Sequence, residues 1–275
     1  MLENNPLKQY FRRPSIYYKL PSMGKYYEPG IVDIPPNGEL PVYPMTAIDE
    51  MTIRTPDGVF NGAAVVELIK SCVPNIIDPW KLNNVDLDST IIAIKAAAGD
   101  GTLTIGSQCP ACQEETEYSI NLMPILADIK NIDYDSILSI RDLNIKFRPL
   151  TYAETNQNGL DQFNVQKILA TLNDYQDDEQ KSLVMNDTLK KLGELVVTII
   201  ASTIESISTP ESVVTDRNFI IDFLNNCDKK TNDIIKDRSI ALREQNELDP
   251  IDVKCPSCQH EYKQKIVLNV TDFFD

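Results

Sequence analysis

Two short cysteine motifs are the residues of this sequence with the clearest chemistry. Cys109 and Cys112 lie in the stretch CPACQ, and Cys255 and Cys258 lie in CPSCQ. On both sides of each motif, apolar and polar residues alternate as they do in short strands. Two thiolates separated by two residues can point inward from one tight turn toward a metal ion. The pair of motifs therefore predicts a structural zinc site with four cysteine ligands, arranged as in a zinc ribbon.

The two motifs are much farther apart than those of a common zinc ribbon. Residues 113–254 separate them, which is 142 residues (254 − 112 = 142), whereas about 15–20 is usual. We interpret the intervening segment as a largely helical domain inserted into one ribbon. A metal ion bound by both motifs would then hold the C-terminal segment against the part of the chain that precedes the insertion.

Other interpretations of the same residues remain open. A redox-active Cys-x-x-Cys places its attacking thiol at a helix N-terminus, but strands are predicted around both motifs here. Iron can also occupy a four-thiolate site. His260, the only histidine, could replace a ligand, although a surface position or a contact to the ligands suits it better. Gln113 and Gln259 stand where many knuckles have glycine in a left-handed conformation, so we expect altered or strained turns.

Composition and charge narrow the class of protein. The net charge of −15 over 275 residues argues against nucleic acid and anionic membranes as partners, because both are polyanions. No apolar run of about 18 residues is present, so membrane insertion is not expected. Residues 1–14 carry charge and proline where a secretion signal needs an apolar stretch. We therefore expect a cytosolic protein whose cysteines bind metal or stay free.

The sequence contains few residues that point to catalysis. A single histidine limits nucleophilic mechanisms, and it lies beside the predicted metal site. Zinc held by four thiolates has no open position for a substrate or water. Phosphate-binding glycine loops are also missing from the sequence. The prediction is a non-enzymatic protein, with a thiol oxidoreductase as the enzymatic alternative.

The predicted elements define an α+β protein with short antiparallel strands and a helical insertion. A Pro- and Tyr-rich arm or hairpin over residues 1–45 packs on its own domain or grips a neighbouring subunit. If it grips a neighbour, deleting residues 1–30 should impair partner binding more than folding. The remaining divisions are 46–150 for the α+β domain with the first motif, 151–248 for the insertion, and 249–275 for the strand segment with the second motif.

Helical patterns place several ends and one apolar stripe. Thr46 followed by Asp49 is typical of a helix start, and Asp88 and Gly99 suggest the cap and the end of a second helix. Within the insertion, apolar residues recur at three- and four-residue steps, which predicts a buried stripe, although an exposed stripe could serve a partner helix. The stripe consists of Leu189, Leu192, Val196, Ile199, Thr203 and Ile207.

The sequence also resembles a known family. Residues 5–27, NPLKQYFRRPSIYYKLPSMGKYY, and residues 43–80, YPMTAIDEMTIRTPDGVFNGAAVVELIKSCVPNIIDPW, are followed by CPAC. This order of a proline-rich N-terminus, a DE…PD…NG…CVP segment and a cysteine knuckle resembles the T4-type bacteriophage baseplate hub protein family over about residues 5–120.

The resemblance implies a non-enzymatic protein of the contractile tail. Such a protein binds other phage baseplate hub and tail proteins in the cytoplasm of the infected host cell, and self-association is compatible with this role. It would act as an assembly factor or chaperone for the baseplate hub, or alternatively as a permanent structural subunit of the virion. The family contributes no catalytic residues, and the zinc site is inferred from the cysteines alone.

Overall fold

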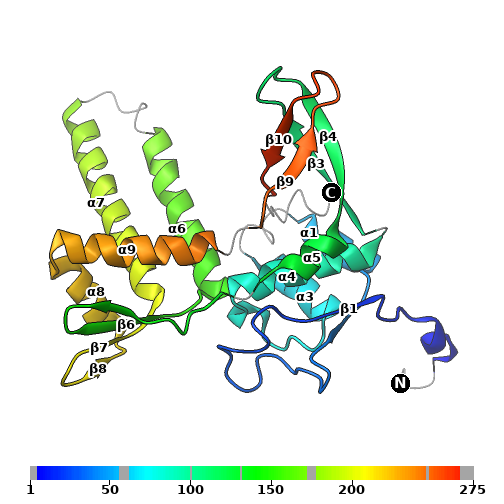
Figure 1. The fold of residues 1–275 in the computed structure, drawn as a ribbon, viewed down its shortest axis with the longest axis horizontal. Helices are drawn as coiled ribbons and strands as arrows, with labels where there is room; N and C mark the ends of the chain where they lie inside the picture. The colour runs from blue at the N-terminus through cyan, green and yellow to red at the C-terminus, as the bar shows by residue number, and fades with distance from the viewer. Residues whose placement is uncertain are drawn as a thin grey trace. The chain divides into compact units, whose positions relative to one another are not determined.

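The structure is a computed structural model that describes residues 5–55, 62–99, 101–130, 132–171, 178–245 and 248–266. The chain forms two compact units. Unit 1 comprises Met1–Asn131 and Glu247–Asp275, and unit 2 comprises Ile132–Asn246. Helices and short antiparallel sheets occur in both (Figure 1), so the predicted α+β fold class is confirmed.

Unit 1 is built around α4 (Asn84–Ala98), a helix buried on almost every side. The helix begins where the side chain of Asn83 accepts a hydrogen bond from the backbone N–H of Asp86, and Gly99 follows its end. The predicted cap at Asp88 is wrong, because the observed cap, Asn83, lies five residues earlier. The other elements of unit 1 are η1 (Pro6–Tyr10), β1 (Ile16–Tyr18), β2 (Leu40–Val42), α1 (Ala47–Ile53), α3 (Ala63–Cys72), η2 (Pro79–Lys81), β3 (Thr102–Gln108), β4 (Glu115–Asn121), α5 (Leu122–Asp128), β9 (Ile251–Lys254) and β10 (Glu261–Gln264).

Two of the local sequence signals correspond to the observed helices. Thr46 and Asp49 form a reciprocal capping box at the start of α1, as predicted. The apolar positions of α3 face inward, with Leu68 and Ile69 at most 1% exposed. The stretch TPDGVFNG over residues 55–62, whose proline and glycines favour a break after α1, lies largely outside the described residues.

Much of the N-terminal segment packs against unit 1 itself. β1 pairs antiparallel with β2, with Tyr18 opposite Leu40. The guanidinium of Arg12 donates hydrogen bonds to the backbone carbonyl of Ser71 at 2.8 Å and to the carboxylate of Asp49 at 3.2 Å. Residues from Arg12 onward are therefore part of the fold, whereas the apolar side chains of η1 and its end, Leu7, Tyr10 and Phe11, are exposed.

A buried carboxylate ties the same segment to α4. Asp86 is fully buried and accepts hydrogen bonds from the backbone N–H and hydroxyl of Ser22, from the Tyr27 hydroxyl at 2.6 Å and from the Asn83 amide at 3.0 Å. Burial raises the pKa of Asp86, and these four donors oppose the rise by stabilising the carboxylate. A buried carboxylate without hydrogen-bond partners costs folding free energy. The burial of Asp86 therefore depends on the donors at Ser22 and Tyr27 being present.

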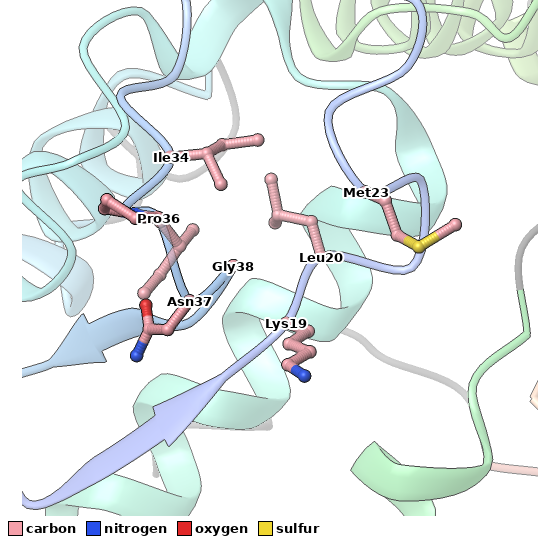
Figure 2. A pocket seen from close by; sticks show the side chains of 8 residues that line it. Lys19, Leu20, Met23, Ile34, Pro36, Asn37 and Gly38 are labelled. Atoms are coloured by element: carbon pink, nitrogen blue, oxygen red, sulfur yellow. The ribbon is translucent and has the colours of Figure 1, made fainter.

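A small cavity of about 270 Å³ lies within the N-terminal segment of unit 1. Figure 2 shows Leu20 and Ile34 facing each other across it, with Met23 and Pro36 at its edges. Among the residues that the structure describes, its walls are mostly aliphatic, and Lys19 is the only charged residue that lines it. These lining residues form no cluster of titratable groups for acid–base or nucleophilic chemistry.

In its described residues, unit 2 combines one antiparallel sheet with four helices. The sheet has the order β5–β6–β7–β8, and Ile145 and Phe147 of β6 are at most 1% exposed. A capping box between Thr151 and Glu154 starts α6, and Arg148 pairs with the same carboxylate. No helix in the described ranges is long and apolar enough to cross a membrane. The elements are β5 (Leu138–Ile140), β6 (Leu143–Phe147), α6 (Tyr152–Ala170), α7 (Asp178–Ser202), β7 (Ile204–Ser208), β8 (Val213–Val214), α8 (Arg217–Asn226) and α9 (Lys229–Glu244).

Strand pairing determines where the inserted unit begins. The sequence places the start of the insertion at residue 151, which is the cap of α6. Unit 2 instead starts at Ile132, because β6, which precedes α6 and α7 in the chain, pairs with β7, which follows them. Ile145 of β6 lies opposite Ile207 of β7. The strands before α6 therefore belong to the inserted unit.

The predicted stripe of α7 differs from the structure in two ways. The helix ends at Ser202, and Ile207 lies in β7 instead. Three of its members are also substantially exposed: Leu189 at 50%, Leu192 at 37% and Val196 at 40%. Periodicity correctly indicated an amphipathic helix, but over these positions the apolar face is not covered by the chain's own core.

Candidate metal centre

Two similar hairpins of unit 1 present the four cysteines. β3 and β4 pair antiparallel up to Gln108 opposite Glu115, and β9 and β10 pair up to Lys254 opposite Glu261. Each pair of strands is therefore joined by six residues, 109–114 in one hairpin and 255–260 in the other. The flanking strands predicted around both motifs are present, and each motif lies in the connection between them (Figure 1).

The two connections have the same hydrogen-bond pattern. The backbone N–H of Cys109 donates to the carbonyl of Glu114, and that of Cys255 donates to His260, both at 2.9 Å. The N–H of Gln113 donates to the carbonyl of Cys109 at 2.8 Å, and that of Gln259 to Cys255 at 3.0 Å. These bonds close two equivalent turns that aim both sulfurs of each motif to the same side.

The glutamine after each motif adopts the conformation for which glycine is usual. Gln113 has φ of 62° and Gln259 has φ of 61°, both in the left-handed region. L-residues with a Cβ pay about 1–2 kcal/mol there. The expectation of a strained turn is thus met at both positions, and the turn geometry itself is that of a cysteine knuckle.

The four sulfurs converge although they come from distant parts of the chain. Cys109 and Cys258 lie 3.6 Å apart at their sulfurs, as do Cys112 and Cys255, and all four sulfurs lie within 4.8 Å of one another. Metal–sulfur bonds of about 2.3 Å in a tetrahedron give sulfur–sulfur edges of about 3.8 Å. Disulfides would need about 2.05 Å, and all four cysteines are free. The cluster can therefore hold one metal ion.

Hydrogen bonds favour a thiolate at Cys109 and the protonated thiol at Cys112. Burial disfavours the thiolate of Cys109, but N–H groups of Cys112 and Ala111 outweigh it and lower the pKa of Cys109 to about 6. The N–H of Glu114 also lowers the pKa of Cys112, yet hydrogen bonds between its thiol and the other three cysteine sulfurs, together with burial, raise it to about 12. A cation at the centre would favour the thiolate form of every cysteine, because metal ligation favours thiolates.

Polar side chains hold the two hairpins together beneath the cysteines. The hydroxyl of Ser107 on β3 lies 2.8 Å from that of Tyr262 on β10 and also donates to the side chain of Gln264. Tyr118 on β4 donates to the carbonyl of Lys254 at 3.2 Å. These contacts orient one half-site against the other before any ligand is considered. These contacts cannot be predicted from the sequence, because alternation shows which strand residues share a face but not what lies opposite.

His260 has no place in the four-cysteine cluster. Its ring is stacked on that of Tyr262, with centroids 6.1 Å apart, and its side chain is exposed. Within each motif, the first cysteine is buried and the second is exposed, so one side of the cluster faces the unit and the other faces solvent. A structural metal site needs no greater exposure to solvent than this.

An α+β chain with two facing Cys-Pro-x-Cys hairpins belongs to the class of proteins that can hold a metal ion in a ribbon-like site. The family can be named as well. The family model described as T4 bacteriophage base plate protein matches residues 33–275, so the chain belongs to this family. The match includes both motifs and all of unit 2, well beyond the region where the sequence resemblance is evident. Searches of curated proteins and of solved structures found no significant match.

Proposed function

We propose that the chain is a non-enzymatic assembly protein of the baseplate hub, which binds other hub and tail proteins while the contractile tail is built. Membership of the baseplate family over residues 33–275 is the observation that carries this proposal. Baseplate construction requires binding between subunits and not turnover of a small substrate. The aliphatic cavity and the four-cysteine cluster agree with a binding protein, since neither presents a catalytic arrangement.

We further propose that Cys109, Cys112, Cys255 and Cys258 bind one zinc ion with a structural role. Four thiolate donors in a near-tetrahedral arrangement are the usual donors of structural zinc. The twin turns support this assignment, because a dithiol catalyst needs only one motif, at a helix N-terminus. Elemental analysis of the purified protein should find about one zinc per chain. Iron in its place, or dithiol–disulfide cycling without metal, would contradict the assignment.

The assembly role is tested by deleting the gene from the phage and supplying the protein in trans. When the gene is deleted and no protein is supplied, infected cells should accumulate hub subunits that do not enter complete baseplates, as judged on sucrose gradients. Protein supplied in trans should restore complete baseplates. Mass spectrometry of purified mature particles should find no stoichiometric amount of this chain, because we place its action in the host cytoplasm. Normal baseplates in its absence would refute the proposal.

The same experiment identifies the alternative, a permanent structural subunit of the virion. Abundant peptides of this chain in mature particles, at a ratio comparable to known tail subunits, would establish that role. A pull-down from infected cells with the tagged chain would then name its direct partner. A Cys255→Ser variant in trans separates the two proposals, since loss of zinc with normal assembly would leave the function intact and make the metal dispensable.

A further inference from the structure

Helix α7 carries a row of apolar side chains that its own unit does not cover. Met185, Leu189, Leu192 and Val196 are 40%, 50%, 37% and 40% exposed. Scattered exposed apolar residues are common on protein surfaces. A continuous row of four on one helix is different, because it forms a contiguous apolar face, and such faces mark interaction sites.

The spacing of these four residues is that of a coiled-coil seam. Steps of four, three and four residues from Met185 to Val196 place them alternately at d and a positions of a heptad. At 1.5 Å per residue, the seam is about 16 Å long. α6 lies beside α7 as the other half of a helical hairpin (Figure 1), and Thr188, on one flank of the seam, is buried. The seam itself remains open to another helix.

The charges of α7 lie away from the seam and pair within the helix. Lys191 contacts Asp187 at 2.7 Å, and Lys190 contacts Glu194 at 3.8 Å, each pair one helical turn apart. These four residues occupy b, c and f positions, on the outer side of the helix. The residues that flank the seam at e and g, Asn186, Thr188, Gly193 and Leu195, carry no charge. The net charge of −15 is therefore not concentrated on this face.

We propose that the occupant of the seam is α7 of a second copy of this chain, packed antiparallel across a two-fold axis. The four seam residues are arranged symmetrically in the sequence about the point midway between Lys190 and Lys191. Met185 and Val196 are equally distant from this point, and so are Leu189 and Leu192. An antiparallel copy centred there places Met185 opposite Val196 and Leu189 opposite Leu192 of its partner, so that a positions face d positions. A two-fold contact requires such a self-complementary surface.

The size of the seam limits the strength of this contact. Stable interfaces bury about 1,200–2,000 Å², and one helix face of about 16 Å provides less. The expected complex is therefore a dimer that dissociates in the micromolar range. The inference does not rest on the baseplate role or on the metal, because α7 belongs to unit 2 and the four cysteines belong to unit 1.

Sedimentation velocity over about 1–200 µM, in about 0.15 M salt to screen the net charge, tests the proposal. The wild-type chain should shift from monomer to dimer with rising concentration. Leu189→Glu with Leu192→Glu should stay monomeric throughout. The matched control is Ile48→Glu with Met51→Glu on α1, which are 72% and 64% exposed and should leave the wild-type behaviour unchanged. A monomeric wild type, or a seam variant that dimerises as well as wild type, would overturn the proposal.

A photo-crosslink tests the register independently of any destabilising change. A benzophenone amino acid at position 185, in a mixture of isotopically light and heavy copies, should give light–heavy adducts on the peptide that contains Leu192 and Val196. Light–heavy adducts from 185 to position 185 itself would indicate a parallel pair, and adducts only within one copy would indicate no pair. Either result would refute the antiparallel dimer.

Discussion

Replacing Cys255 with serine tests whether a metal ion joins the two ends of unit 1. The expected magnitude follows from the length of chain between the motifs. A cross-link that closes 142 residues lowers the entropy of the unfolded chain by the equivalent of about 5 kcal/mol at 25 °C. If unit 2 stays folded while unit 1 unfolds, only about 27 residues, 113–131 and 247–254, form the flexible loop, which corresponds to about 3.5 kcal/mol. We therefore expect Cys255→Ser to lower the free energy of unfolding of unit 1 by about 3.5–5 kcal/mol.

Fluorescence of Trp80 provides an assay specific to unit 1, because it is the only tryptophan of the chain and lies in η2. Urea unfolding is measured for the wild type, for Cys255→Ser and for Cys227→Ser, each with zinc and with a chelator. Cys227 is a half-exposed free thiol of unit 2, so its variant should behave as wild type. Chelation should destabilise the wild type and leave Cys255→Ser unchanged. Equal midpoints for these two proteins in zinc would refute the cross-link.

Three further changes have outcomes that the structure specifies. Gln113→Gly and Gln259→Gly should each raise the free energy of unfolding by about 0.5–1 kcal/mol, because relief of the left-handed strain exceeds the added entropy of the unfolded chain. Urea midpoints measure this change. Gln108→Gly in β3 is the control and should lower stability. Glu154→Gln tests a pH dependence. Burial alone would raise the pKa of Glu154, but hydrogen bonds from Arg148 and Thr151 lower it below its usual 4.5. Its stabilisation is therefore complete above about pH 4.5 and is lost as pH falls through the lower folded value, so the gap between wild type and Glu154→Gln should close in acid. Deletion of residues 1–11 should leave the circular dichroism spectrum of the rest intact, whereas deletion of residues 1–30 should unfold unit 1; a folded product of the longer deletion would contradict the role given to Asp86.

The four-cysteine cluster was predictable because its signal is local. Each Cys-Pro-x-Cys motif determines its own turn, and the alternating residues around it predict the hairpin that holds it. The glutamines at 113 and 259 could be flagged from sequence for the same reason, since backbone conformation after a knuckle depends on a few neighbouring residues. To predict that the two motifs come together, it was enough to assume that neither pair of cysteines forms a complete metal site alone.

The features that could not be predicted from the sequence depend on contacts between residues far apart in the chain. Asp86 has the sequence features of an ordinary helix-start carboxylate, and only the fold shows that Ser22 and Tyr27 bury it. That network reverses the expected effect of deleting residues 1–30, from lost binding to lost folding. Likewise the period of α7 indicates an apolar face, but whether a face is covered depends on what packs against it. The limits of unit 2 were missed because β6 and β7 are separated by the whole of α6 and α7.

The position of unit 2 between the two half-sites determines the order in which the metal site can form. During synthesis, Cys109 and Cys112 emerge before any residue of unit 2, and Cys255 and Cys258 emerge after all of it. Domains generally fold as units while the chain is made, and unit 2 has its own sheet and its own buried residues, such as Phe147 and Ile220. Closure of the ribbon is then the last step of folding. It follows that chelation should open the hairpins of unit 1 while the helices of unit 2 persist, and simultaneous loss of all helical signal on chelation would show that the two units do not fold separately.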